Sequence, residues 1–353
     1  MHINDLLRKS VELKASDIHI TVGVPPMVRI HGRLQTLGDQ KVSGRLSFEL
    51  CKQVLTEKEF NTLTEKGEID CAYAIEGLAR FRVNAYKQKN ACALALRLVS
   101  DTVPPMEDLR LPAVLKDLCR KQRGLILVTG PTGSGKSTTL ASMIDFMNRE
   151  MNKHIITIED PIEYLHSHRS CIINQRQIGK DSISFSNALR AALRQDPDVI
   201  LVGEMRDLET ISIALTAAET GHLVLSTLHT VGAAKTLDRV IDAFPPNQQQ
   251  QIKVQMAAVL EAVVSQQIIP RKDNQGRVVA FEIMLANSAV RSLVREGKTH
   301  QLQSVIETSR GDHMQTMDGN LLSLYQNGLI DRKNLYNYAV DLPAVKKEVE
   351  GVG

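Results

Sequence analysis

Several features that would assign a chain to a common class of protein are scarce or missing in these 353 residues. There is no Trp, and aromatic residues make up 4% of the chain, so few side chains could stack on nucleic-acid bases. The formal net charge of +3 is too small to indicate nucleic-acid binding by itself. The five cysteines are scattered without a C-x-x-C pair, which argues against a zinc site and for a reducing cytoplasm.

Long apolar runs are missing as well. Every run is far shorter than the roughly 20 residues that span a bilayer, and residues 1–5, M-H-I-N-D, do not resemble a secretory signal. With 43% hydrophobic and 24% charged residues, the composition is that of an ordinary globular protein, and the length suits two domains. We therefore expect a cytoplasmic protein with two domains.

The most specific stretch is residues 130–137, which read G-P-T-G-S-G-K-S and match the phosphate-binding loop motif G-x-x-x-x-G-K-[ST]. An apolar run at 125–129 precedes the loop, as a buried strand would, and apolar residues at helical spacing follow it. This order places backbone N–H groups against phosphate oxygens at a helix N-terminus. We expect Lys136 to reach the β- and γ-phosphates of ATP and the Ser137 hydroxyl to bind Mg²⁺. The expected nucleotide contacts in the loop are Gly130, Pro131, Thr132, Gly133, Ser134, Gly135, Lys136, Ser137 and Thr138.

The pattern along the chain indicates how it is divided. Residues 1–99 combine helical stretches, one of them at 50–63, with alternating strand-like stretches, which predicts a small α+β domain. Residues 100–112 hold three prolines and no periodicity, which predicts a linker. A second domain is expected over 113–342, and residues 343–353 are expected to form a flexible tail.

The second domain alternates short apolar strands with helices, which is typical of a parallel α/β sheet. The predicted strands are 125–129, 154–158, 199–203 and 223–228. Because ligands bind at the carboxyl ends of parallel strands, polar residues there are candidates for a site: Glu159, Asp160, Glu163, Glu204 and His229. After residue 242 the pattern is mostly helical, apart from a hairpin with strands at 268–269 and 278–281 and a turn at 273–276.

Nucleotide hydrolysis needs Mg²⁺, a group that orients or deprotonates water, and positive charge on the developing phosphoryl oxygens. Glu204 ends a buried strand where a second acidic motif belongs, although Gly203 stands where an Asp is usual. We expect Glu204 to position or activate the attacking water. Glu163 is the candidate loop carboxylate that joins the loop serine at the metal, with Glu159 and Asp160 in support or capping local backbone.

Two histidines and two arginines complete the set of candidates. His222 and His229 flank the third strand, and each suits either a packed, hydrogen-bonded histidine or a nucleotide contact. At the γ-phosphate end, His229 would serve as a sensor of hydrolysis. Arg82 and Arg97 lie on strand-like stretches of the first domain, where a charged side chain usually faces solvent. Because the loop contains no guanidinium, one of them supplied from another domain or subunit would provide the missing charge.

Taken together, these motifs resemble the type II/IV secretion ATPase superfamily. Residues 130–138 and 158–164 look like its Walker A loop and Asp box, and 201–207 look like its atypical Walker B, glycine included. Residues 221–230 resemble its His box. Within the superfamily, A-V-R-S-L-V-R-E at 289–296 is similar to the AIRNLIRE motif of the PilT branch, the type IV pilus retraction motors.

The resemblance implies a PAS-like N-terminal domain, a RecA-like parallel-sheet ATPase core with a helical C-terminal part, and a homohexameric ring that uses ATP and Mg²⁺. It also implies that Glu204 is the catalytic glutamate, Glu163 the Asp-box acid that assists the metal, and His222 and His229 the His-box pair, with His229 at the catalytic site and His222 at the nucleotide. The implied partner is the platform protein beneath the pilus, which would place the ring at the cytoplasmic face of the inner membrane, peripheral to it.

The resemblance leads to one preferred function and leaves alternatives. We expect a motor that powers pilus retraction and twitching motility, and no nucleic-acid partner. An accessory retraction motor, an extension or secretion ATPase, a nucleotide-gated regulator and a nucleic-acid motor on the same core are the alternatives.

Overall fold

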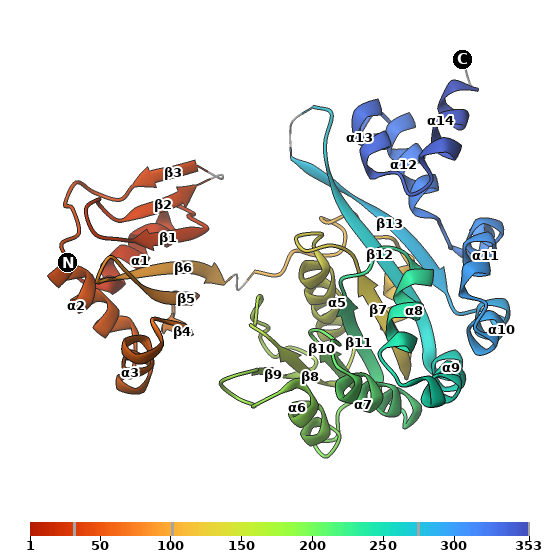
Figure 1. The fold of residues 1–353 in the computed structure, drawn as a ribbon, viewed down its shortest axis with the longest axis horizontal. Coiled ribbons are helices and arrows are strands. Elements are labelled where there is room, and N and C mark those ends of the chain that lie inside the picture. Colours follow the sequence, from red (N-terminus) through yellow and green to blue (C-terminus); the bar gives the residue numbers. More distant parts are fainter. Residues whose placement is uncertain (31–32, 100–101, 274–275, 352–353) are drawn as a thin grey trace. The chain divides into compact units, whose positions relative to one another are not determined.

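The computed structural model describes residues 1–353 except 31–32, 100–101, 274–275 and 352–353. The chain forms two compact units (Figure 1). The first comprises Met1–Thr102 together with Glu163–Leu165, and the second comprises the chain from Val103 onward without that short segment. The division after Thr102 falls inside the expected linker 100–112, of which residues 100–101 lie outside the described part.

The first unit is an antiparallel sheet with helices packed on it. Its strands pair in the order β3-β2-β1-β6-β5-β4. The strands are β1 (Asp17–Ile20), β2 (Met27–Ile30), β3 (Arg33–Thr36), β4 (Glu68–Ile75), β5 (Ala79–Gln88) and β6 (Ala91–Val99), and the helices are α1 (Ile3–Glu12), α2 (Gly44–Val54) and α3 (Glu57–Lys66). This is the small α+β unit that the sequence predicts.

One helix of this unit differs from the expectation. The sequence predicts a single helix over 50–63, but α2 ends at Val54 and α3 begins at Glu57. The break occurs because Thr56 starts a new helix: its side chain accepts from the Glu59 N–H, while the Glu59 carboxylate accepts from the Thr56 N–H. Such a capping box satisfies two backbone donors at a helix start, and the apolar spacing of 50–63 hides it.

The second unit is built on a largely parallel sheet in the order β13-β12-β7-β11-β10-β8-β9, with only β13 antiparallel to its neighbour. The strands are β7 (Gly124–Thr129), β8 (His154–Glu159), β9 (Ile172–Gln177), β10 (Val199–Val202), β11 (Leu223–Leu228), β12 (Leu260–Pro270) and β13 (Arg277–Leu285). Every residue of β7, β10 and β11 is buried, as strands covered on both faces require. The predicted α/β class with a parallel-sheet core is confirmed.

Helices cover this sheet and form the C-terminal part of the unit (Figure 1). They are α4 (Val114–Cys119), α5 (Lys136–Glu150), α6 (Phe185–Ala192), α7 (Leu208–Glu219), α8 (Ala233–Asp242), α9 (Pro246–Val259), α10 (Ser288–Glu296), α11 (Leu302–Thr308), α12 (Met317–Gln326), α13 (Arg332–Tyr338) and α14 (Leu342–Glu350), with the 3₁₀ helices η1 (Thr299–Gln301) and η2 (Arg310–Asp312). Two hydrophobic clusters fill the space between sheet and helices.

The register of the parallel strands brings their carboxyl ends to one edge. Val202 of β10 pairs with Ile158 of β8 and with Ser226 of β11. Leu228 of β11 in turn pairs with Thr129 of β7. The residues that follow these strands therefore emerge side by side, which is the arrangement that a site at this edge requires.

The C-terminal hairpin is longer than the local pattern indicates. The predicted strands 268–269 and 278–281 are the outer parts of β12 (Leu260–Pro270) and β13 (Arg277–Leu285). The extra length of β12 pairs in parallel with β7, a long-range contact that a local pattern does not reveal. Residues 274–275 of the predicted turn lie outside the described part of the chain.

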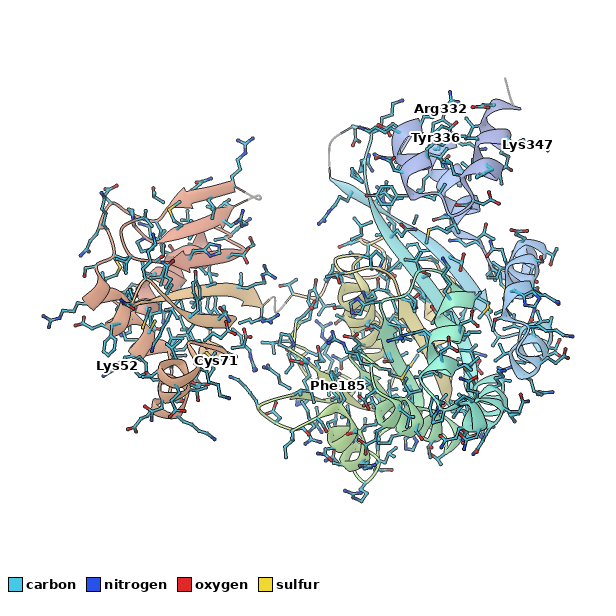
Figure 2. All side chains as sticks on the ribbon, viewed as in Figure 1. Lys52, Cys71, Phe185, Arg332, Tyr336 and Lys347 are labelled. Carbon is cyan, nitrogen blue, oxygen red and sulfur yellow. The ribbon has the colours of Figure 1, made fainter. Side chains whose placement is uncertain are left out.

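The prediction of a flexible tail over 343–353 is wrong for residues 343–350, which belong to α14. Asp341 caps this helix by accepting from the Ala344 N–H, and Val345 is 1% exposed in a small apolar core shared with α12 and α13. The Arg332 guanidinium, which also lies over the Tyr336 ring (Figure 2), pairs with Glu350 at 3.1 Å. Residues 352–353 lie outside the described part.

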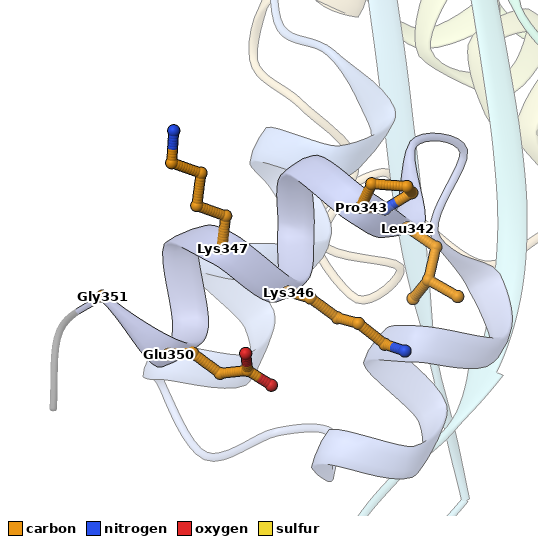
Figure 3. Close-up of a pocket in the computed structure, with 6 residues that line it drawn as sticks. All are labelled: Leu342, Pro343, Lys346, Lys347, Glu350 and Gly351. Atoms are coloured by element: carbon orange, nitrogen blue, oxygen red, sulfur yellow. The ribbon is translucent and has the colours of Figure 1, made fainter.

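A shallow hollow of about 530 Å³ runs along α14 (Figure 3). Its lining residues are Leu342, Pro343, Lys346, Lys347, Glu350 and Gly351. The floor is formed by the helix itself, so the hollow belongs to the surface of the C-terminal helices, whereas the candidate chemistry lies at the sheet edge after β7.

Candidate nucleotide-binding site

The loop between β7 and α5 has the geometry of a phosphate-binding loop. Gly135 is the N-cap of α5, so the helix begins at Lys136 and its first N–H groups point back into the loop. The start of a helix carries partial positive charge, which favours phosphate. A Cβ at Gly133 would meet no atom within 4 Å, so the backbone there is open to a ligand.

The floor of the loop is formed by Gln266 of β12, which the sequence reasoning missed. Gln266 is fully buried, and its Nε2 donates to the Ser134 carbonyl oxygen at 2.6 Å. A Cβ at Gly130 would overlap the Gln266 carbonyl oxygen, so only glycine allows the loop to pass this close to β12. The local signal was a pair of glutamines, Gln266 and Gln267, inside β12, and the partner of Gln266 lies 132 residues away.

A continuous chain of polar contacts joins the loop to the ends of β10 and β11. Lys136 Nζ donates to the carbonyl oxygens of Gly130 and Pro131 at 2.8 and 3.1 Å and lies 3.5 Å from Nδ1 of His229. Nε2 of His229 lies 3.3 Å from Oε1 of Glu204. Because an ammonium can only donate, Nδ1 of His229 must accept, which leaves the ring proton on Nε2 facing the glutamate.

Arg206 is a second partner of Glu204. It lies in the 201–207 motif, but the sequence analysis assigns it no role. Arg206 Nε lies 2.6 Å from the same Oε1 atom. Partial burial of Glu204 opposes its ionisation, but the hydrogen bond from Arg206 and the nearby His229 outweigh this effect and lower the pKa of the carboxyl below its usual value. Glu204 is therefore an ionised carboxylate at neutral pH, as a group that accepts a proton from water must be.

Gly203 explains why the usual Asp before the glutamate is replaced. A Cβ at this position would lie 3.1 Å from the carbonyl oxygen of Ile158 and 3.4 Å from Cα of Glu159. The Gly203 N–H donates to the same Ile158 oxygen at 2.7 Å, so the end of β8 passes directly beside this position. A side chain here would crowd the backbone of β8, and glycine avoids this contact.

The two acids at the end of β8 have different surroundings. Oε1 of Glu159 accepts from the Thr157 hydroxyl at 2.6 Å and from Nε2 of Gln175 at 3.1 Å, so this carboxylate is tied to β8 and β9. Asp160 is exposed and close enough to Arg206 to help raise the pKa of that guanidinium, after the larger effect of Glu204. Asp160 therefore lies at the rim of the Glu204 group.

His222 stands apart from this group within one chain. It precedes β11, whereas His229 follows it, so the six residues of the strand separate the two histidines by about 20 Å. Nδ1 of His222 lies 2.9 Å from the Ala217 carbonyl oxygen, and its own carbonyl accepts from the Gly124 N–H at the start of β7. In a single chain these contacts connect α7 to the start of the sheet.

Three candidate residues belong to the first unit: Arg82, Arg97 and Glu163. Arg82 of β5 pairs directly with Arg97 of β6 across the sheet. Both line a hollow of about 400 Å³, and Arg97 Nε donates to Oδ1 of Asp17 at 2.8 Å. The second unit alone brings Lys136 and Glu204 together, without these three residues.

The residues of the loop fit a nucleotide with Mg²⁺. Ser137 follows Lys136 in the first turn of α5 and is half-buried. In the part of the chain that the structure describes, no group of three or more His, Cys, Asp or Glu side chains is arranged to hold a metal ion. Mg²⁺ that binds with nucleotide phosphates needs only one or two protein ligands, which Ser137 and one carboxylate would supply.

A phosphate-binding loop after a central parallel strand, with a glutamate and a histidine at neighbouring strand ends, defines the class of P-loop nucleotide-binding proteins. The chain belongs to the family of type II/IV secretion system proteins, whose family model matches residues 1–330. The resemblance inferred from the motifs is thereby confirmed.

Individual relatives are more specific. The chain is 46% identical over 334 residues to the type IV pilus retractation ATPase PilT of Pseudomonas aeruginosa, covering 95% of this chain and 97% of that protein. It is 40% identical to the type IV pilus ATPase PilU of the same organism, covering 96% and 89%. Its fold matches a crystal structure of the pilus retraction motor PilT with bound ADP at a TM-score of 0.92 and 45% identity, covering 98% and 99% of the two chains.

Among the described residues, no helix combines the length and the apolar character needed to cross a bilayer.

Proposed function

We propose that this chain is an ATP-hydrolysing motor that powers the retraction of type IV pili and thereby twitching motility. The observation that carries the proposal is the chain of contacts from Lys136 through His229 to Glu204, which joins the phosphate-binding loop to a candidate catalytic carboxylate. The near full-length similarity to a pilus retractation ATPase supports the choice of pilus retraction among the tasks of the family.

The loop residues have distinct roles in this proposal. The backbone N–H groups of residues 130–138 and the ammonium of Lys136 hold the phosphates. Glu204 orients and deprotonates the attacking water, for which its ionised state is suited. Lys136 now contacts carbonyl oxygens of its own loop and Nδ1 of His229, so it must turn toward the phosphates when ATP binds. His229 would then lose the lysine as a donor, which makes it a sensor of the bound phosphate.

Mg²⁺ is the expected metal, and when bound it would neutralise negative charge on the nucleotide phosphates. Ser137 would hold it, with Glu163 as the carboxylate that assists. Glu159 and Asp160 are the further acids proposed beside the nucleotide, and His222 is proposed to act with His229. For His222, whose position in one chain is remote, such a role requires a contact made by a neighbouring subunit.

We further propose that the motor is a homohexamer in which Arg82 and Arg97 supply positive charge to a nucleotide. Their exposure on one face of the first sheet supports this, since Arg97 is 69% exposed even while it is paired with Asp17. An arginine finger accelerates phosphoryl transfer by roughly a thousandfold or more. Changing both arginines to alanine should abolish turnover and spare nucleotide binding, whereas Arg45→Ala on α2 is the control. Unchanged turnover would remove the two arginines from the site.

The proposed partner is the platform protein of the pilus in the inner membrane. The motor would bind it from the cytoplasm and remain peripheral to the membrane. Oligomeric assembly with pilus machinery is a property of the family, and contact with this particular partner is the step that we propose.

ATP turnover by the purified full-length protein tests the catalytic assignment. Glu204→Gln keeps the size of the side chain and removes its ability to accept a proton, so turnover should fall about 10²- to 10⁴-fold while binding of a fluorescent ATP analogue is retained. Glu209→Gln is the matched control, because Glu209 is a half-exposed glutamate paired with Arg190 on neighbouring helices. Turnover by Glu204→Gln at the rate of the wild type would refute the assignment.

A further inference from the structure

We propose that Arg206 is the residue that orients Glu204 for catalysis. The inference rests on the proposed catalytic role of Glu204 and assigns a function to an arginine that neither the motif reading nor the comparisons single out. Arg206 acts through the glutamate, so it is a positioning residue.

Arg206 and His229 both approach the same carboxylate oxygen of Glu204. Arg206 Nε lies 2.6 Å from Oε1, and Nε2 of His229 lies 3.3 Å from the same atom. A carboxylate accepts a proton at one oxygen, and because Arg206 and His229 both approach Oε1, we assign the acceptance of the proton to Oε2.

The backbone fixes Arg206 beside its partner. Met205, which lies between them in the chain, is 2% exposed, and its N–H donates to the Thr227 carbonyl oxygen on β11. Asp207, which follows, is the N-cap of α7 and accepts from the Thr210 N–H at 2.8 Å. The backbone of Arg206 therefore lies between a buried residue and a helix cap, and its side chain, although 75% exposed, reaches Oε1 of Glu204.

Charge also distinguishes this contact from an ordinary surface ion pair, which would contribute little. The charged or titratable groups that face Glu204 are Arg206 and His229, and Asp160 at the end of β8 acts on Arg206. Partial burial of Glu204 favours its protonated form, and Arg206 is the larger of the two influences that keep it ionised. Without the guanidinium, the carboxyl would bind a proton at a higher pH and lose its fixed orientation.

The test compares Arg206→Gln, Arg206→Lys and a control, Arg190→Gln, in the assembled full-length protein. Arg190 on α6 forms a half-exposed ion pair with Glu209 on α7, and neither residue has a proposed role at the nucleotide, so its loss should leave kcat unchanged. For each protein, kcat and KM for ATP are measured from about pH 5 to pH 9, and binding of a fluorescent ATP analogue is measured separately.

We expect Arg206→Gln to lower kcat about 10- to 100-fold at neutral pH with little change in KM or binding, because a misplaced base affects only the chemical step. As the pH is lowered, Arg206→Gln should also lose activity at a higher pH than the wild type does, because its Glu204 carboxylate binds a proton more readily. Arg206→Lys keeps the positive charge but changes the shape of the donor. Its acid limb should therefore lie close to that of the wild type, while its kcat at neutral pH remains reduced.

Three outcomes would overturn the inference: an unchanged profile and rate in Arg206→Gln, an equal loss of kcat and binding at every pH, or an increased rate. The last would mean that the arginine restrains Glu204. Glu204→Gln in the same assay separates the two proposals. If Glu204→Gln remains active, the proposed catalytic site fails, whereas an inactive Glu204→Gln beside a normal Arg206→Gln refutes only the role of Arg206.

Discussion

The hydrogen bond beneath the phosphate-binding loop leads to a sharp prediction. Nε2 of Gln266 donates to the Ser134 carbonyl oxygen at 2.6 Å, and Oε1 of the same fully buried side chain has no partner in the described residues. Gln266→Leu removes the donor and the unsatisfied oxygen together while keeping most of the volume. The substitution therefore separates the support of the loop from the stability of the unit.

The two effects have different magnitudes. Removing the donor leaves the Ser134 carbonyl unsatisfied, which costs about 1–3 kcal/mol, and removing Oε1 relieves a cost of about the same size. Global stability should thus change by no more than about 1.5 kcal/mol. The loop, however, loses a hydrogen bond with a net contribution of about 0.5–1.5 kcal/mol, which corresponds to nucleotide binding that is about 2- to 13-fold weaker if the bound loop must recover that order.

The assay combines titration with a fluorescent ATP analogue and urea unfolding of the same protein. Gln267→Leu is the matched control, because Gln267 is the next residue on β12, is half-buried and points to the opposite face. Binding by Gln266→Leu that equals the wild type would refute the reasoning. An equal loss in Gln267→Leu would show that any leucine in this strand disturbs the loop.

Two further predictions concern residues outside the loop. Arg291 donates to the carbonyl oxygens of Ala257 and Ala258 at the end of α9 and to Glu261 at 2.9 Å, so Arg291→Ala should cost about 1–3 kcal/mol in stability; an unchanged thermal midpoint would contradict this. Glu282 accepts from the N–H groups of Ala233 and Met317, and burial raises the pKa of its carboxyl. The native state therefore binds this proton more readily than the unfolded chain, so wild-type stability measured in urea should improve relative to Glu282→Gln as pH falls from about 7 to 5, and a difference independent of pH would disprove it.

The sequence was most informative where the structure is local. The run of apolar residues before Gly130, the loop itself and the helix from Lys136 are adjacent in the chain, so spacing alone predicts their order. Another local feature is Asp207, a residue type favoured at helix starts, which accepts from the Thr210 N–H as an N-cap does. Strand ends could be aligned because parallel strands place them at one edge.

Features that depend on distant contacts could not be predicted in the same way. The pairing of β12 with β7 and the hydrogen bond from Gln266 to Ser134 connect residues more than a hundred positions apart. The role of α14 depends on Val345 packing against α12 and α13, which its charged local sequence conceals. The sequence also does not reveal that Arg206 and His229 contact the same oxygen of Glu204, because these three residues come from the ends of two different strands.

The central claim is that hydrolysis at the Glu204 site powers pilus retraction. The most direct measurement counts surface pili and scores twitching motility in cells that lack the gene and carry either the wild type or Glu204→Gln. The account predicts abundant pili without motility in the deletion and with Glu204→Gln, and restored motility with the wild type alone. Cells without pili, or motility restored by Glu204→Gln, would contradict it.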